Sequence, residues 1–268
     1  MIYLFSNNGL RFLESVCFTR TLFAFDFDGT LSKIVKNPDD ARIHPKTLKL
    51  LKRLSQIAPV AVISGRGLSD LKEKFNPSPG FLVGNHGLEG IHIGNQKLEM
   101  FRESCEQWKK HLAQTLKKTE LEGIEIEDKA FSIAIHYRKS RVKRHAKTLI
   151  LEALGELTPS ARVVLGKCVV NVVPTGAPHK GVALLELMLK AEAKSALYIG
   201  DDDTDEDVFA LSDPGLFTIR VGKKSLSQAK FYIERQAEVN VLLERLLKFL
   251  EHDTKHKGDV HRENRRST

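Results

Sequence analysis

Short apolar runs that end abruptly in charged or small polar residues recur along this chain. Residues 21–25, 59–63, 81–84 and 196–199 are rich in β-branched and aromatic residues and contain no charged break. Runs of this kind are typical of strands buried on both faces of a parallel sheet. Segments between them, such as 45–57, place apolar residues at helical spacing. The two ends of the chain therefore predict one parallel sheet covered by helices.

The middle of the chain has a different pattern, in which apolar and polar residues alternate. Such alternation is typical of antiparallel strands with one exposed face. We expect a hairpin at 91–100, a helix at 103–118, strands at 124–126 and 130–137, a helix ending at 157, and strands at 162–165 and 168–173. The fold class is therefore α/β: a Rossmann-like core with a parallel sheet, formed by residues 1–92 and 174–251, and an inserted α+β cap formed by residues 93–173.

Two carboxylates follow the first buried run directly. Asp26 and Asp28 end the run, and Gly29-Thr30 then turns the chain away. Open α/β sheets bind their ligands at the carboxyl ends of their strands. Alternation places the two carboxylates on one side, where they repel each other unless a cation lies between them or one is protonated. A lone Asp would more simply cap a turn, but this pair favours a hard divalent ion such as Mg²⁺.

Polar residues also occupy other strand ends and one helix start. Ser64 and Gly65 follow the second run, where a hydroxyl and backbone amides can bind a phosphate oxygen. Lys180 begins a predicted helix, where a cation opposes the helix dipole, so a functional role against negative charge is favoured. After the last apolar run, we expect Asp201 to bind the metal and Asp205 to orient Lys180 or a metal-bound water.

One histidine, His86, follows the third apolar run within Asn85-His86-Gly87. This residue could face the same pocket as the carboxylates, or it could serve the fold alone. The sequence leaves both roles open.

Composition and charge narrow the class of protein. No apolar stretch approaches the ~20 residues of a membrane helix, and the three cysteines are scattered as in a reducing compartment. We therefore expect a cytoplasmic protein with no membrane partner. The net charge of +8 is concentrated in 138–147, read as a solvated helix face, and in 252–268, a basic tail whose composition predicts disorder. Aromatic residues are not interleaved with these basic residues, so we expect no nucleic-acid partner, and anionic substrates account for the charge.

Several stretches together resemble the haloacid dehalogenase (HAD) phosphotransferases and, within them, the trehalose-6-phosphate phosphatases. The stretches are DFDGTL, ISGR, GNHGLE, DKAFSIAIHYR, GKCVVNVVPTGAPHKG and GDDDTDE, within a region from about Leu22 to Glu251. The resemblance implies a cap of the C2 type and Mg²⁺ as cofactor. It also implies that Asp26 attacks phosphorus to form an aspartyl phosphate, while Asp28 protonates the leaving oxygen and later activates water.

The same resemblance assigns the remaining site residues. The implied catalytic residues are Asp26, Asp28 and Lys180; the phosphate ligands are Ser64, Gly65 and Lys180; the metal ligands are Asp26, Asp28 and Asp201, with Asp205 behind them; and the sugar contacts are Lys129, His136, Arg138 and Asn171. Two cap positions depart from the family pattern. Asn171 stands where the family usually has Glu, and Val173 stands where it usually has a basic residue.

The leading hypothesis is a Mg²⁺-dependent phosphatase that hydrolyses trehalose 6-phosphate to trehalose and phosphate. We expect a monomer that acts on a small sugar phosphate, after a trehalose-6-phosphate synthase. One alternative is a phosphatase for another glycosyl phosphate, such as sucrose 6-phosphate or glucosylglycerol phosphate. The other is a sugar-phosphate sensor that keeps the fold without catalysis.

Overall fold

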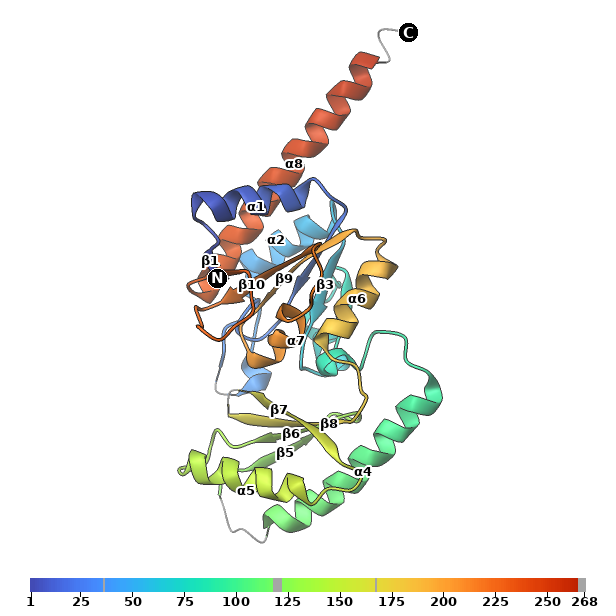
Figure 1. Ribbon diagram of the computed structural model, residues 1–268, viewed down its shortest axis with the longest axis vertical. Coiled ribbons are helices and arrows are strands. Elements are labelled where there is room, and N and C mark those ends of the chain that lie inside the picture. Colours follow the sequence, from blue (N-terminus) through green and yellow to red (C-terminus); the bar gives the residue numbers. More distant parts are fainter. Residues whose placement is uncertain (36, 118–121, 167, 265–268) are drawn as a thin grey trace.

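The computed structural model of the chain contains two sheets, each packed against helices (Figure 1). It describes residues 1–35, 37–117, 122–166 and 168–264, with side chains as far as His252. The larger sheet is parallel and has the order β1 (Ile2–Tyr3), β11 (Phe231–Ile233), β10 (Leu216–Val221), β9 (Ser195–Gly200), β2 (Thr21–Phe25), β3 (Val60–Ile63), β4 (Phe81–Val83). The smaller sheet is antiparallel and has the order β5 (Glu125–Asp128), β6 (Ile133–His136), β8 (Val169–Pro174), β7 (Ala161–Gly166). The predicted α/β class, with a parallel core and a separate α+β unit, is confirmed.

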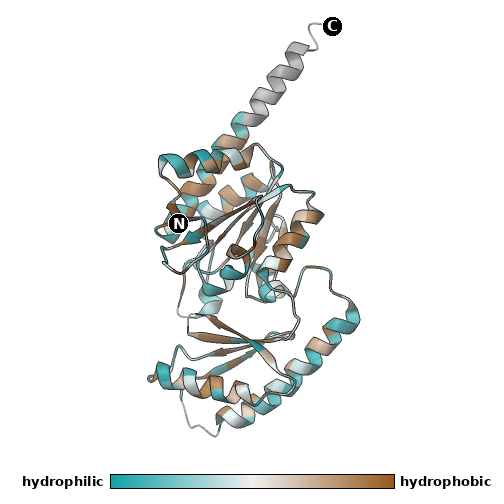
Figure 2. Cartoon of the chain, viewed as in Figure 1, coloured by the Kyte–Doolittle hydropathy of each residue, from teal (hydrophilic) through white to brown (hydrophobic). Residues whose placement is uncertain are grey.

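Strand β2 lies inside the larger sheet and is buried on both faces. Phe23 and Phe25 face one apolar cluster, and Leu22 and Ala24 face another, as the two-residue period of a strand requires. The strands of this sheet are correspondingly apolar in Figure 2. The helices on the first face are α1 (Asn7–Cys17), α2 (Pro45–Ser55), α3 (Leu68–Lys74) and α8 (Val239–Asn264), and those on the second are α6 (Lys180–Lys190) and α7 (Glu206–Phe209).

Helices α4 (Asn95–Lys117) and α5 (Lys143–Gly155) cover one face of the smaller sheet. Ile135 of β6 and Val170 of β8 pack in this cluster with Trp108 of α4. Because side chains alternate along a strand, His136 and Asn171 point to the opposite face. That face looks toward the larger sheet (Figure 1), so the cap presents polar side chains to the core.

The predicted hairpin at 91–100 is wrong, because α4 begins at Asn95. Phe101, Cys105 and Trp108 recur at intervals of four and three and are all buried. This helical period outweighs the short alternation at its N-terminal side. The cap therefore has the element order αββαββ in place of the expected ββαββαββ.

Helix α8 is longer than the apolar pattern suggested. Leu242, Leu243 and Leu246 pack it against the core, and the helix continues to Asn264, whereas composition led us to expect disorder from residue 252 onward. Extending an existing helix costs much less than starting one, so the packed first half supports the continuation. Neither α8 nor any other helix in the described part of the chain is both long enough and apolar enough to cross a membrane.

The packing of the cap yields a matched pair of variants. Leu112 is fully buried in the cap, whereas Leu189 on α6 is 81% exposed. Leu112→Ala leaves a cavity and should lower the free energy of unfolding by about 2–5 kcal/mol, while Leu189→Ala should change it by less than about 0.5 kcal/mol. Urea unfolding followed by the fluorescence of Trp108, the chain's one tryptophan, measures both. Equal effects of the two substitutions would contradict this account of the cap.

Candidate active site

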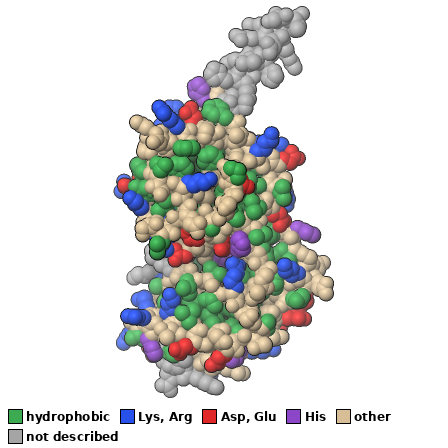
Figure 3. Space-filling model, in the orientation of Figure 1, with side chains coloured by type: hydrophobic (Ala, Val, Ile, Leu, Met, Phe, Trp, Pro, Cys, Tyr) green, Lys and Arg blue, Asp and Glu red, His purple; other side chains and the backbone are tan. Residues whose placement is uncertain are grey.

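Three of the predicted site residues of the core follow the carboxyl ends of adjacent strands. Asp26 follows β2, Ser64 follows β3, and Asp201 follows β9. A cavity of about 630 Å³ opens here and is lined by residues of both the core and the cap. Acidic, basic and histidine side chains also gather near this level on the face shown in Figure 3. Every predicted site residue except Asp205 lines the cavity: Asp26, Asp28, Ser64, Gly65, Lys129, His136, Arg138, Asn171, Lys180 and Asp201.

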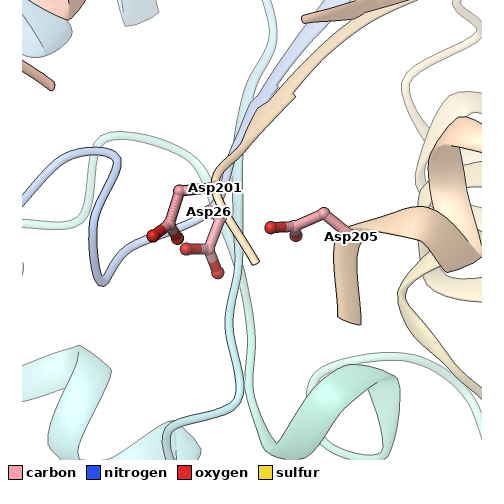
Figure 4. A group of neighbouring side chains, drawn as sticks. All are labelled: Asp26, Asp201 and Asp205. Atoms are coloured by element: carbon pink, nitrogen blue, oxygen red, sulfur yellow. The ribbon is translucent and has the colours of Figure 1, made fainter. Parts of the chain in front are cut away.

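Three carboxylates meet beside this cavity. Asp26, Asp201 and Asp205 each place an oxygen within 4.8 Å of the others (Figure 4). The Lys180 ammonium, at the first residue of α6, donates to Asp26 Oδ1 at 2.7 Å and to Asp205 Oδ1 at 2.8 Å. Lys180 is 2% exposed. The structure thus brings together four of the predicted residues, three carboxylates and one buried cation.

The electrostatics of this group follow from burial. Burial raises the pKa of Asp26 well above its usual value, and Lys180 opposes that shift. Burial also raises the pKa of Asp201 to about 7, with Asp205 and Asp202 adding to the effect. Burial alone would lower the pKa of Lys180, but Asp205 and Asp26 raise it, so the lysine remains charged. An ammonium held between two carboxylates opposes their protonation, and further positive charge near Asp201 would be stabilising.

Asp205 is committed to protein partners. Its Oδ1 accepts a hydrogen bond from the Tyr198 hydroxyl at 2.6 Å in addition to that from Lys180, and its Oδ2 accepts one from the Asp202 backbone amide at 2.9 Å. A Cβ on Gly200 would lie 2.2 Å from the Asp205 carboxyl carbon, so that glycine makes room for the side chain. Asp205 therefore fixes Lys180, and the oxygens left for a metal are those of Asp26 and Asp201.

These two carboxylates fit a Mg²⁺ ion. Carboxylate oxygens are hard ligands, and Mg²⁺ takes one or two of them while keeping waters. Asp201 lies against the turn that follows Asp26, since a Cβ on Gly29 would approach Asp201 Oδ2 to 2.1 Å. The glycine of the Asp-x-Asp-Gly stretch thus allows the two carboxylates to approach each other.

Asp28 lies apart from the three carboxylates. Arg66 Nε donates to Asp28 Oδ2 at 2.7 Å, and Arg66 Nη2 donates to Asp28 Oδ1 at 2.8 Å. Both oxygens of the predicted acid are thus bound by one guanidinium. Sequence reasoning gave Arg66 no role, although it stands in the Ser-Gly-Arg turn next to the predicted phosphate ligands, because such turns are common.

His86 lines the cavity beside Gly65, and a Cβ on that glycine would lie 2.4 Å from the imidazole Cε1. Burial lowers the pKa of His86 well below its usual value, and Lys129 and Lys180 lower it further, so the ring is neutral. Neither ring nitrogen has a hydrogen-bond partner among the described residues. The backbone of His86 is left-handed, with φ of 58°. The sequence left open whether His86 faces the pocket or serves the fold alone, and the structure places it in the pocket.

The cap residues approach the core at several points. Lys129 Nζ donates to the Gly65 carbonyl at 2.9 Å, and Arg138 Nη1 donates to the Val35 carbonyl. His136 Nε2 lies 2.7 Å from Glu127 Oε2, and Glu127 also lines the cavity, although the sequence analysis did not single it out. The sequence did contain a signal for Glu127, because it stands two positions before Lys129, and residues two apart along an extended chain point to the same side.

The two cap residues that depart from the family pattern, Asn171 and Val173, lie in different surroundings. Asn171 lines the cavity and is 4% exposed, with its Nδ2 3.4 Å from the Val164 carbonyl. Val173 is fully buried in an apolar cluster with Leu88 and Phe101. Asn171 therefore faces the cavity, whereas Val173 packs where the cap meets the core.

Comparison with known proteins is consistent with this site. A family model described as trehalose-phosphatase matches residues 24–238. A trehalose-phosphate phosphatase of Mycobacterium tuberculosis is 34% identical over 200 residues, which cover 71% of this chain and 51% of that protein. One of Mycobacterium ulcerans is 32% identical over 208 residues, covering 74% of this chain and 53% of that protein. The chain thus spans about half the length of these curated relatives.

Solved structures extend the likeness. The C-terminal domain of trehalose-6-phosphate phosphatase from C. albicans matches with a TM-score of 0.73 at 21% identity. The match covers 90% of this chain and 97% of that domain. At this identity it supports the fold alone. The Aspergillus fumigatus trehalose-6-phosphate phosphatase has a TM-score of 0.62 at 26% identity, with 92% and 99% covered. The match of the family model spans the first Asp pair, the cap and the Lys180–Asp205 region. This chain belongs to the trehalose-phosphatase family.

Proposed function

We propose that this protein is a Mg²⁺-dependent phosphatase that hydrolyses trehalose 6-phosphate to trehalose and phosphate. One observation carries the proposal: a buried Lys180 bound to Asp26 at 2.7 Å, next to Asp201, in a cavity shared by core and cap. A carboxylate is a competent nucleophile toward phosphorus once nearby positive charge offsets the repulsion. Family membership supports the choice of substrate.

The proposed reaction has two steps. A carboxylate oxygen of Asp26 attacks phosphorus, the bond from phosphorus to the sugar oxygen breaks, and Asp28 gives that oxygen a proton. Water then attacks the phosphorus of the aspartyl phosphate, Asp28 takes a proton from the water, and phosphate leaves with Asp26 restored. One carboxyl group thus acts as acid and then as base, which needs only a position within reach of both oxygens.

Lys180 and the phosphate-binding residues prepare the nucleophile. Lys180 favours the ionised form of Asp26, against the effect of burial, and fixes the direction of its carboxylate, while Asp205 fixes Lys180. The Ser64 hydroxyl and the Gly65 amide would hold phosphate oxygens. Asp26 and Asp201 would hold Mg²⁺, which when bound supplies positive charge against the phosphate dianion.

The cap would recognise the sugar. Lys129, His136, Arg138 and Asn171 line the same cavity from the cap. Their donors and acceptors suit sugar hydroxyl groups. A closed cap would also exclude bulk water, so that the aspartyl phosphate meets only the activated water molecule.

A phosphatase for another glycosyl phosphate is the second candidate, and Asn171 is the observation that favours it. A cavity with a neutral amide at this position offers a sugar one donor and one acceptor in place of a charged acceptor. The structure argues against a non-catalytic sensor. Burying a charged lysine against Asp26 costs free energy, and binding a sugar phosphate without catalysis does not require that pair.

The nucleophile is tested by Asp26→Asn. The amide has the same shape but cannot attack phosphorus, so kcat should fall by roughly three orders of magnitude or more while the fold is retained. The matched control is Asp213→Asn, at the opposite end of the sheet from the cavity, where the side chain accepts from the Gly215 amide. Steady-state hydrolysis and circular dichroism measure the two properties. Near-normal turnover by Asp26→Asn would exclude the aspartyl phosphate.

Metal dependence is tested by chelation. The carboxylates of Asp26 and Asp201 repel a phosphate dianion, so activity should vanish after exhaustive chelation and return with Mg²⁺. Ca²⁺ should restore little, because its larger and more variable coordination shell disturbs the alignment for attack. Asp201→Asn should weaken Mg²⁺ binding at least about tenfold by calorimetry, and Asp213→Asn should leave it unchanged. Full activity without metal would refute the cofactor assignment.

Substrate identity is tested by a kcat/KM panel of trehalose 6-phosphate, glucose 6-phosphate, sucrose 6-phosphate and glucosylglycerol phosphate. We expect trehalose 6-phosphate to lead. A charged hydrogen bond is stronger than a neutral one by about 1–2 kcal/mol, or tenfold or more in discrimination. Asn171→Glu should therefore preserve or improve kcat/KM for trehalose 6-phosphate, but should impair the native reaction if the pocket suits another sugar. A preference of more than about tenfold for any other member of the panel would reject trehalose 6-phosphate.

A further inference from the structure

Each of the three nitrogens of the Arg66 guanidinium, which lies at the edge of the cavity, donates a hydrogen bond. Its Nε and Nη2 donate to the two oxygens of Asp28 at 2.7 and 2.8 Å, its Nη1 donates to Asp70 Oδ2 at 2.7 Å, and Nη2 also donates to the Pro38 carbonyl at 2.7 Å. The side chain is 9% exposed. A planar guanidinium matches a carboxylate with two parallel hydrogen bonds, which fixes the carboxylate plane as well as its distance.

Arg66 is the better-anchored partner of this pair. Its guanidinium carbon lies 5.0 Å from the centre of the Phe27 ring, and its backbone amide is 3.3 Å from the Ser64 hydroxyl oxygen. Asp70, which binds its Nη1, is itself held by Lys74 at 3.2 Å. The Asp28 side chain, in contrast, is 41% exposed and lines the cavity. Contacts other than Asp28 thus hold the Arg66 side chain in place, and Arg66 in turn holds the Asp28 carboxylate.

We propose that Arg66 is a positioning residue that sets the orientation of the Asp28 carboxylate for proton transfer. The inference rests on the proposed function, in which Asp28 exchanges protons with the sugar oxygen and with water. One Asp28 oxygen can turn to the substrate while the other remains on the guanidinium, since the contacts to Asp70 and Pro38 hold Arg66 in place. A lysine at this position would supply charge without the two parallel bonds, so charge alone does not replace Arg66.

The test compares two leaving groups in Arg66→Lys and Arg66→Gln. A sugar phosphate needs a proton on its leaving oxygen, whereas an activated aryl phosphate such as p-nitrophenyl phosphate does not. Both variants should lower the single-turnover rate of phosphoryl transfer from the sugar phosphate by about 10- to 100-fold, a part of the 10²–10⁴ that general acid catalysis contributes. The burst of nitrophenol release should change less than about threefold. Arg53→Gln, which removes an exposed ion pair with Glu251, is the matched control and should leave both rates unchanged.

A double-mutant cycle separates positioning from direct binding. If Arg66 acts through Asp28, the Asp28→Asn/Arg66→Gln double variant should transfer the phosphoryl group no more slowly than Asp28→Asn alone. Additive losses, together with weaker inhibition by inorganic phosphate in Arg66→Gln, would show that Arg66 binds the phosphate and would overturn the inference. Equal losses for both leaving groups in a folded variant would overturn it as well.

The same experiment separates this inference from the proposed function. If the unmodified protein hydrolyses phosphate esters and Arg66→Gln changes the rate with neither leaving group, the positioning role of Arg66 is refuted and the proposed phosphatase activity stands. Absence of turnover of any phosphate ester by the unmodified protein would remove both. Circular dichroism melting of each variant shows that a lost rate is not a lost fold.

Discussion

A lysine ammonium buried between two carboxylates is the constraint on which this site depends. Removing an ion from water costs several kcal/mol, and only close, hydrogen-bonded partners offset that cost. Lys180 has these partners in Asp26 and Asp205, and the buried hydroxyl of Tyr198 donates a further hydrogen bond to the Asp205 carboxylate. Loss of Lys180 would leave two buried carboxylates without their shared counterion. The relative positions of the segments after β2 and β9 and of the start of α6 are therefore coupled through one side chain.

Sheet geometry explains why such distant segments meet. Strands β9, β2 and β3 are neighbours and all run in the same direction, so their carboxyl ends share one edge. Each of these ends carries a polar residue, while the strands themselves are apolar on both faces. The hydrophobic core thus aligns the strands, and the residues immediately after them receive their positions from that alignment. The cap then covers the same edge with the polar face of its own sheet.

The sequence predicted the strands and the residues that follow them because both are local features. Of the side-chain pairs, it predicted that Asp205 would orient Lys180 or a metal-bound water, and the side chains of Asp205 and Lys180 lie 2.8 Å apart. It did not predict the pair of Asp28 and Arg66. Asp26 and Lys180 are separated by 154 positions, and Asp28 and Arg66 by 38, so no periodic pattern relates them. Asp28 was predicted as a metal ligand next to Asp26, but the structure directs its carboxylate to Arg66. The start of α4 was missed for a different reason, since three alternating residues before it imitated a strand. Local patterns establish where a polar residue stands, and tertiary packing decides what it contacts.

The inner face of the cap shows how packing also limits the choice of residue. In the cap sheet, Arg162 of β7 lies directly opposite Val173 of β8, and the Arg162 side chain reaches toward Asp207 of the core at 3.8 Å. Like charges directly across a strand pair destabilise it, and Val173 is fully buried among apolar side chains. A basic side chain at position 173 would therefore meet Arg162 on one side and lose its hydration on the other. The apolar residue at 173 is thus consistent with a cap that places its basic residue, Arg162, on the neighbouring strand. Of the two positions that depart from the family pattern, only Asn171 then lines the cavity.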